Sequence, residues 1–214
     1  EQTPLIAAQG IAILLEAGVP PGVVQLLPGQ GETVGAQLTG DDRVRGVMFT
    51  GSTEVATLLQ RNIASRLDAQ GRPIPLIAET GGMNAMIVDS SALTEQVVID
   101  VLASAFDSAG QRCSALRVLC LQDEIADHTL KMLRGAMAEC RMGNPGRLTT
   151  DIGPVIDSEA KANIERHIQT MRSKGRPVFQ AVRENSEDAR EWQSGTFVAP
   201  TLIELHDFAE LQKE

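Results

Sequence analysis

The chain has 214 residues, of which 43% are hydrophobic and 22% are charged, so it can bury a core and is not disordered as a whole. This length suits one large domain or two small ones. The formal net charge of −9 argues against a nucleic-acid-binding surface, which needs clustered Lys and Arg.

The first part of the chain alternates helical and strand patterns, which predicts an α/β fold with mostly parallel strands. Thr3 is a candidate N-cap, and Pro4 suits the first turn of a helix that ends at Gly18. The elements predicted next are a strand over residues 23–27, a helix over 32–38, a strand over 44–50, a helix from 51 to about 67, and a strand over 75–79.

The alternation continues after Gly81-Gly82, whose turn chemistry marks the predicted boundary between a domain over residues 1–82 and one over 83–214. Gly143 begins a Gly-Asn-Pro-Gly segment that ends a long helix, and Gly175 is a candidate C-cap. The polar residues 183–193 are predicted to form a surface loop. The elements predicted here are strands over 85–88, 116–121, 177–181 and 197–204, and helices over 94–109, 123–142 and 158–174.

The sequence has no signal for a membrane span, a secretory leader or a metal site. No apolar run approaches the ~18 residues that a span requires, and residues 1–4 carry no basic region. The cysteines, Cys113, Cys120 and Cys140, are odd in number and have neither C-x-x-C spacing nor a neighbouring His. A disulfide framework and a zinc site are therefore not expected. A reduced, cytoplasmic setting is the expected one.

Three short segments have residues suited to chemistry, and the first runs from Phe49 to Thr53. Here a strand gives way to a helix through Thr50, Gly51 and Ser52. The free N–H groups of a helix N-terminus suit a phosphate, and the Ser52 hydroxyl could bond to it. An ordinary N-cap explains the same residues, and G-x-G-x-x-G is absent.

The second segment is Glu79-Thr80-Gly81-Gly82, at the end of an apolar strand. A carboxylate there lies where α/β proteins usually bind ligands, and partial burial would make it a better base. The two glycines let the backbone approach a flat ligand. The alternative is a solvated glutamate followed by a turn.

The third segment is Gly110-Gln111-Arg112-Cys113-Ser114. A turn before a strand can expose Cys113, and Arg112 with nearby N–H groups would favour the nucleophilic thiolate. The alternative is a buried cysteine that acts as a small hydrophobe, the reading that better fits Cys120 and Cys140.

In this order and approximate spacing, the three segments resemble the motifs of the aldehyde dehydrogenase superfamily, and the resemblance covers essentially the whole chain. Glu79-Thr80-Gly81-Gly82 is similar to the E-[LT]-G-G motif and Gly110-Gln111-Arg112-Cys113 to G-Q-x-C. The resemblance implies an α/β, aldehyde-dehydrogenase-like fold, with half of a Rossmann-type NAD-binding domain followed by the first part of an α/β catalytic domain. Met83 departs from the pattern, because many relatives carry Lys there.

Residues 73–82 and 111–115 are most similar to glutamate-semialdehyde (Δ1-pyrroline-5-carboxylate) dehydrogenases, in particular to that module in the bacterial bifunctional proline-utilisation family. This resemblance implies oxidation of L-glutamate 5-semialdehyde to glutamate in proline catabolism, in a homo-oligomer. Members of that family also carry an FAD-dependent proline dehydrogenase and, in some cases, a DNA-binding domain. Neither module is visible in this sequence.

The resemblance assigns a role to each candidate residue. Cys113 is the nucleophile, Glu79 the general base, and Ser114 a contact for the substrate carboxylate. NAD is the implied cofactor, because an acidic residue at position 1 would pair with a ribose hydroxyl and repel a 2′-phosphate. The implied cofactor-binding residues are Glu1, Thr50, Gly51, Ser52, Gly81 and Glu214. The family's ribose-binding Lys and oxyanion-hole Asn fall outside this sequence, so the chain alone is expected to be inactive.

Three other functions remain open at this point. The chain can be a folded or oligomerising piece with no catalysis of its own. It can belong to an aldehyde dehydrogenase of another substrate, including one that transfers the acyl group to coenzyme A, although such enzymes usually lack the Glu base. A cysteine hydrolase is a third reading, but no His lies near Cys113 in the sequence.

Overall fold

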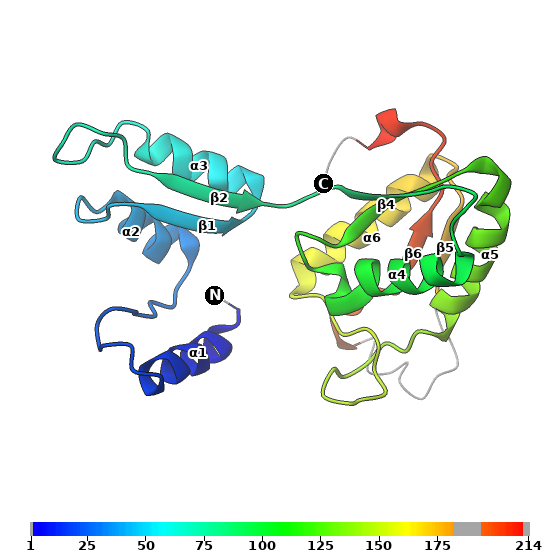
Figure 1. The fold of residues 1–214 in the computed structure, drawn as a ribbon, viewed down its shortest axis with the longest axis horizontal. Coiled ribbons are helices and arrows are strands. Elements are labelled where there is room, and N and C mark those ends of the chain that lie inside the picture. The colour runs from blue at the N-terminus through cyan, green and yellow to red at the C-terminus, as the bar shows by residue number, and fades with distance from the viewer. Residues whose placement is uncertain (1, 182–193, 212–214) are drawn as a thin grey trace. The chain divides into compact units, whose positions relative to one another are not determined.

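In a computed structural model, residues 2–181 and 194–211 are described, and they form two compact units (Figure 1). The first unit spans Glu1–Thr80 and the second Gly81–Glu214. The boundary expected from the sequence lies two residues later, after Gly82. The assignment of the two parts to cofactor binding and catalysis stays a prediction.

The first unit begins with α1 (Pro4–Glu16), as predicted, with Pro4 in the first turn and Thr3 at the N-cap position. The Thr3 side chain makes no capping hydrogen bond. No residue of α1 is buried, and Leu5 is 83% exposed. The apolar side chains of α1 therefore remain partly or largely exposed in the described part of the chain.

The strand predicted over residues 23–27 is wrong. The backbone there makes only an isolated bridge between Pro21 and Val24, and Val23 and Leu27 are exposed. A strand needs a neighbour for its N–H and C=O groups, and no described segment lies beside this one to supply it. The apolar run alone could not reveal that.

The core of the first unit is a β-α-β arrangement that starts after a short helical segment. η1 (Gly31–Gly35) and α2 (Ala36–Gly40) replace the single helix predicted over 32–38. β1 (Val47–Gly51) and β2 (Leu76–Thr80) pair in parallel, and α3 (Thr53–Ile63) lies along one face of the pair (Figure 1). Ala56, Ile63 and Ile74 form the buried residues of this packing.

Within its described residues, the second unit contains the β3–β4 and β5–β6 strand pairs and the helices named below. β3 (Asn84–Val88) and β4 (Leu116–Leu121) are parallel, whereas β5 (Val178–Gln180) and β6 (Thr201–Ile203) are antiparallel. Of the three described pairs, β1–β2 and β3–β4 are parallel, as the mostly parallel prediction expects, and β5–β6 is antiparallel. The helical segments are α4 (Thr94–Phe106), which continues as η2 (Asp107–Gly110), α5 (Asp123–Glu139), α6 (Ser158–Ser173) and η3 (Phe208–Glu210).

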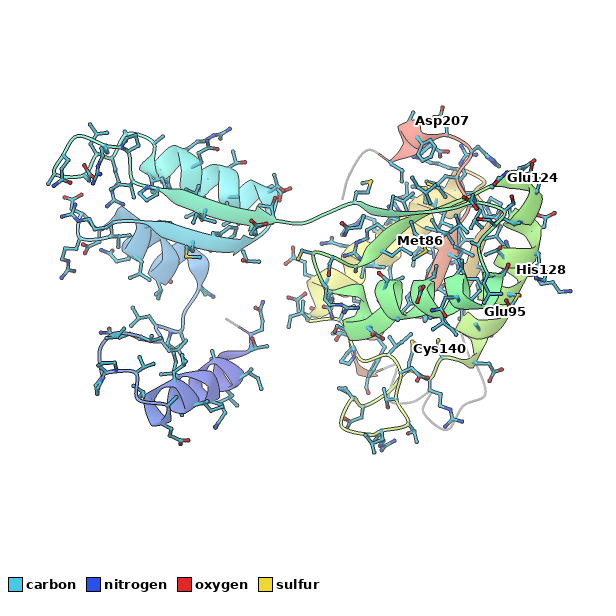
Figure 2. All side chains as sticks on the ribbon, in the orientation of Figure 1. Met86, Glu95, Glu124, His128, Cys140 and Asp207 are labelled. Atoms are coloured by element: carbon cyan, nitrogen blue, oxygen red, sulfur yellow. The ribbon has the colours of Figure 1, made fainter. Side chains whose placement is uncertain are left out.

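Two helices and the β3–β4 pair enclose the main core of this unit (Figure 2). Apolar side chains spaced three or four residues apart place one face of each helix inward. The sequence predicts Gly175 as the C-cap of α6. The C-cap is Lys174, and Gly175 follows it with a left-handed φ of +73°, so it stops the helix one position later. The predicted loop over 183–193 lies outside the described residues. The buried side chains of the core come from β3, β4, α4 and α5: Val88, Leu116, Val97, Val98, Val101, Leu133 and Met137.

Candidate active site

Cys113 lies in a tight turn between η2 and β4. The Ala115 N–H donates to the Arg112 carbonyl oxygen at 3.0 Å, so Cys113 and Ser114 occupy the two central positions of the turn. Both are exposed, whereas Cys120 and Cys140 are partly buried. The turn therefore presents one thiol to solvent, and the buried-hydrophobe alternative does not apply to Cys113.

The backbone that leads into this turn is strained. Ser108, Ala109 and Gly110 are consecutive residues in the left-handed region, with φ of +56°, +53° and +68°. This conformation costs a non-glycine residue about 1–2 kcal/mol. A Cβ on Gly110 would lie 2.7 Å from the Ala105 carbonyl oxygen, so glycine is required there. Backbone strain of this kind clusters at functional sites.

The two residues before Cys113 fasten the turn to other parts of the second unit. Gln111 donates to the Ser108 carbonyl oxygen at 3.0 Å and accepts from the Ile156 N–H at 2.8 Å. Arg112 donates to the carbonyl oxygen of Ala103 at 3.0 Å, and its guanidinium is 4.0 Å from the Asp107 carboxylate. The Arg112 guanidinium is therefore bonded within the second unit, and the support that it would give to a Cys113 thiolate stays a prediction.

Two residues at the start of the second unit contact the turn, and sequence reasoning missed both contacts. The Asn84 side-chain amide donates to the carbonyl oxygens of Cys113 at 2.7 Å and of Ala115 at 3.0 Å. A Cβ on Gly82 would lie 2.8 Å from the Cys113 carbonyl oxygen. Gly82 therefore makes room for the turn that contains Cys113. The pair Gly81-Gly82 predicts that another group comes close to the backbone there, but nothing nearby in the sequence identifies that group as the Cys113 turn.

In the first unit, four predicted residues gather at the carboxyl ends of the strands. The parallel register pairs Thr50 with Glu79 and Gly51 with Thr80. Ser52 follows as the N-cap of α3, where its oxygen accepts from the Val55 N–H at 3.2 Å. Thr50, Gly51, Ser52 and Glu79 are all exposed, so the partial burial expected for Glu79 is not found within this unit.

The remaining predicted site residues are distributed unevenly. Ser114 shares the turn with Cys113, and Gly81 is the exposed first residue of the second unit. Glu1 and Glu214 lie outside the described residues. Across residues 2–181 and 194–211, no group of His, Cys, Asp or Glu side chains could hold a metal ion. Over the same ranges, every helix is too short or too polar to cross a membrane.

The sequence matches a known family and named relatives. Residues 1–214 match the aldehyde dehydrogenase family. The chain is 99% identical over 214 residues to the bifunctional protein PutA of Escherichia coli (strain K12), across 100% of this chain and 16% of that protein. It is 33% identical to the 1-pyrroline-5-carboxylate dehydrogenase of Bacillus cereus (strain B4264), across 99% of this chain and 40% of that protein.

Solved structures agree with these matches. A mutant of proline utilization A (PutA) from Bradyrhizobium japonicum is similar with a TM-score of 0.88 and 44% identity, over 100% of this chain and 21% of that one. 1-Pyrroline-5-carboxylate dehydrogenase from Thermus with bound NAD is similar with a TM-score of 0.79 and 33% identity, over 93% of this chain and 37% of that one. The expected α/β fold is thereby confirmed, and the chain spans a minor part of each relative's length.

Proposed function

This chain belongs to the aldehyde dehydrogenase family, and we propose that it carries the nucleophile and the general base for NAD-dependent oxidation of L-glutamate 5-semialdehyde to glutamate. The observation that carries this proposal is the exposed Cys113 thiol at the centre of a hydrogen-bonded turn that directly follows a strained segment. The substrate is supported by 33% identity to a protein named 1-pyrroline-5-carboxylate dehydrogenase, since opening of that ring by water gives the semialdehyde.

Residues at the carboxyl end of β1 suit the phosphates of NAD. Ser52 uses its oxygen as the N-cap acceptor, which leaves its hydroxyl proton free to donate. α3 behind it has 11 residues, and the first N–H groups of such a helix have no partner within it. We assign Thr50, Gly51, Ser52 and Gly81 to cofactor binding, with Glu1 and Glu214 at its two riboses. When bound, the nicotinamide accepts the hydride from the substrate carbon.

The first half of the reaction belongs to the Cys113 turn. The thiolate forms a C–S bond with the aldehyde carbon, and the carbonyl π electrons move to oxygen. The Cys113 backbone N–H donates to this oxyanion. Loss of hydride restores the C=O bond and leaves a thioester on Cys113. Ser114, beside the nucleophile, donates its hydroxyl to the carboxylate of the substrate.

The second half belongs to Glu79. Its carboxylate removes a proton from water, the hydroxide adds to the thioester carbon, and the C–S bond breaks to release glutamate and the Cys113 thiolate. An exposed position at the end of β2 leaves the carboxylate accessible to water. The whole protein is proposed to be cytoplasmic and homo-oligomeric, with FAD confined to a separate proline dehydrogenase module and no nucleic acid bound by this segment.

The test is NADH formation by the full-length protein with glutamate semialdehyde and with simple aliphatic aldehydes. Cys113→Ser is expected to abolish turnover and to leave NAD binding unchanged. Glu79→Gln is expected to form NADH in a burst that stops near one equivalent per site, because the thioester is made and not hydrolysed. The isolated 214-residue chain, assayed beside the full-length protein, is expected to form none.

Cys140→Ser is the matched control for the nucleophile. Its sulfur, labelled in Figure 2, donates to the Ala136 carbonyl oxygen at 3.6 Å, a bond that a hydroxyl can also make. Wild-type turnover is expected in this variant. Turnover retained by Cys113→Ser would refute the nucleophile, and equal rates on all aldehydes would refute the substrate. Acyl transfer to coenzyme A in place of glutamate release would support the acylating alternative.

A further inference from the structure

We propose that Asn84 is a positioning residue for Cys113. Its side-chain amide fixes the plane of the peptide between Cys113 and Ser114, and so sets the direction of the sulfur. The inference rests on the proposed function, because it takes Cys113 as the nucleophile. Asn84 is half-buried at the first position of β3 and lies 29 residues before Cys113 in the sequence.

The Asn84 side chain uses its full donor capacity on the turn. An amide nitrogen carries two hydrogens, and they go to the carbonyl oxygens of Cys113 at 2.7 Å and of Ala115 at 3.0 Å. Both acceptors belong to the four residues that contain the nucleophile. No other standard side chain of this length offers two donors from one nitrogen, so the pairing accounts for asparagine at this position.

These bonds constrain the chain on the exit side of Cys113. In a trans peptide, the C=O of one residue and the N–H of the next point in opposite directions. Fixing the Cys113 carbonyl toward Asn84 therefore directs the Ser114 N–H away from it. The plane on the entry side is held separately, because the Arg112 carbonyl oxygen accepts from the Ala115 N–H at 3.0 Å and from Arg117 at 3.4 Å.

With both flanking planes held, the Cα–Cβ bond of Cys113 has a defined direction. Addition of sulfur to an aldehyde requires a near-attack geometry, and a misplacement of ~1 Å can cost about 100-fold in rate. The backbone N–H that meets the oxyanion must be placed with similar accuracy. Loss of Asn84 is therefore expected to impair aldehyde oxidation more than any reaction that tolerates a loosely directed thiol.

The experiment compares two reactions of Cys113 in the full-length protein with Asn84→Ala and Asn84→Asp. Aldehyde oxidation needs a directed sulfur and an oxyanion donor, whereas alkylation by iodoacetamide is a displacement that needs neither. We expect kcat/KM for glutamate semialdehyde to fall about 10- to 100-fold, with alkylation rate and NAD Kd within about 3-fold of wild type. Asn84→Asp is expected to fall further, because its oxygens face the same two carbonyl oxygens.

Asn163→Ala is the matched control, since Asn163 is exposed on α6 and bonds only Arg166 among the interactions described. It is expected to behave as wild type in all three measurements. Unchanged kcat/KM in Asn84→Ala would overturn the proposal, and so would a parallel loss of oxidation, alkylation and NAD binding, which indicates general damage. Failure of the proposed function gives a different result, namely oxidation by Cys113→Ser.

Discussion

Replacing Gly82 with alanine places a methyl group directly against the turn that contains Cys113. The new Cβ would lie 2.8 Å from the Cys113 carbonyl oxygen and 3.2 Å from the Asn84 amide nitrogen. Gly82 is not among the positive-φ residues, so alanine can adopt its backbone conformation. The substitution therefore perturbs the close approach and leaves the local backbone preference largely unchanged.

The expected size of the effect follows from the contact distance. Carbon and oxygen atoms in close contact lie about 3.3 Å apart or more, so the strand start and the turn must separate by about 0.5 Å. Since a misplacement of ~1 Å can cost about 100-fold in rate, this movement predicts a loss of about 10-fold in kcat/KM, which equals about 1.4 kcal/mol in transition-state stabilisation.

The assay is steady-state NADH formation from glutamate semialdehyde, with NAD affinity measured beside it. NAD Kd is expected to stay at the wild-type value, because the new methyl group contacts the Cys113 turn and not the residues that we assign to NAD. Gly135→Ala is the control, since its Cβ would meet nothing within 4 Å, and in the middle of α5 it should raise stability by about 0.5–1 kcal/mol. Wild-type kcat/KM in Gly82→Ala would refute the argument that the close approach of Gly82 to the Cys113 carbonyl oxygen determines the position of the turn.

Three further changes test other parts of the second unit. Gly110→Ala forces a left-handed φ and a Cβ 2.7 Å from a carbonyl oxygen of α4, so the thermal unfolding midpoint should fall by at least the shift that corresponds to about 1–2 kcal/mol. Asp157→Ala removes the N-cap of α6 and should cost about 1 kcal/mol in chemical denaturation. Two hydrogen bonds from Ser91, first that of its hydroxyl and second that of its backbone N–H, hold the pKa of Asp89 below its usual value. The stability that these bonds contribute is present above the unfolded-state pKa and is lost as pH falls through the folded-state pKa. Ser91→Ala should raise that pKa in an NMR titration, and an unmoved titration would contradict the cause.

Local signals in the sequence were sufficient for most of the regular elements. The end of α6 shortly before Gly175 and the extent of β4 are predicted by a glycine and by an apolar run, both of which act within a few residues. The strand over residues 23–27 had the same kind of signal and did not form. Strand formation depends on a partner elsewhere in the chain, and an apolar run carries no information about that partner.

In the candidate site too, some features are predictable from neighbouring residues and others depend on strand pairing. Exposure of Cys113 followed from turn residues next to it, whereas the two bonds of Asn84 depend on the parallel pairing of β3 with β4. The sequence predicts that Gly82 lets the backbone approach a flat ligand. The pairing of β3 with β4 also brings Gly82 close to the Cys113 carbonyl oxygen. The support of the thiolate by Arg112 is predicted from adjacency alone, and adjacency could not show that the Arg112 side chain donates to the Ala103 carbonyl oxygen in the last turns of α4.

The 29-residue separation between Asn84 and Cys113 also orders events during folding. Helices form in about a microsecond from local contacts, whereas a parallel strand pair must first close a long loop against chain entropy. The two bonds from Asn84 to the Cys113 turn can form only when β3 meets β4. In a newly made or refolding chain, the Cys113 sulfur is therefore present before Asn84 constrains its direction, and during that interval oxidants and alkylating agents meet an unconstrained thiol.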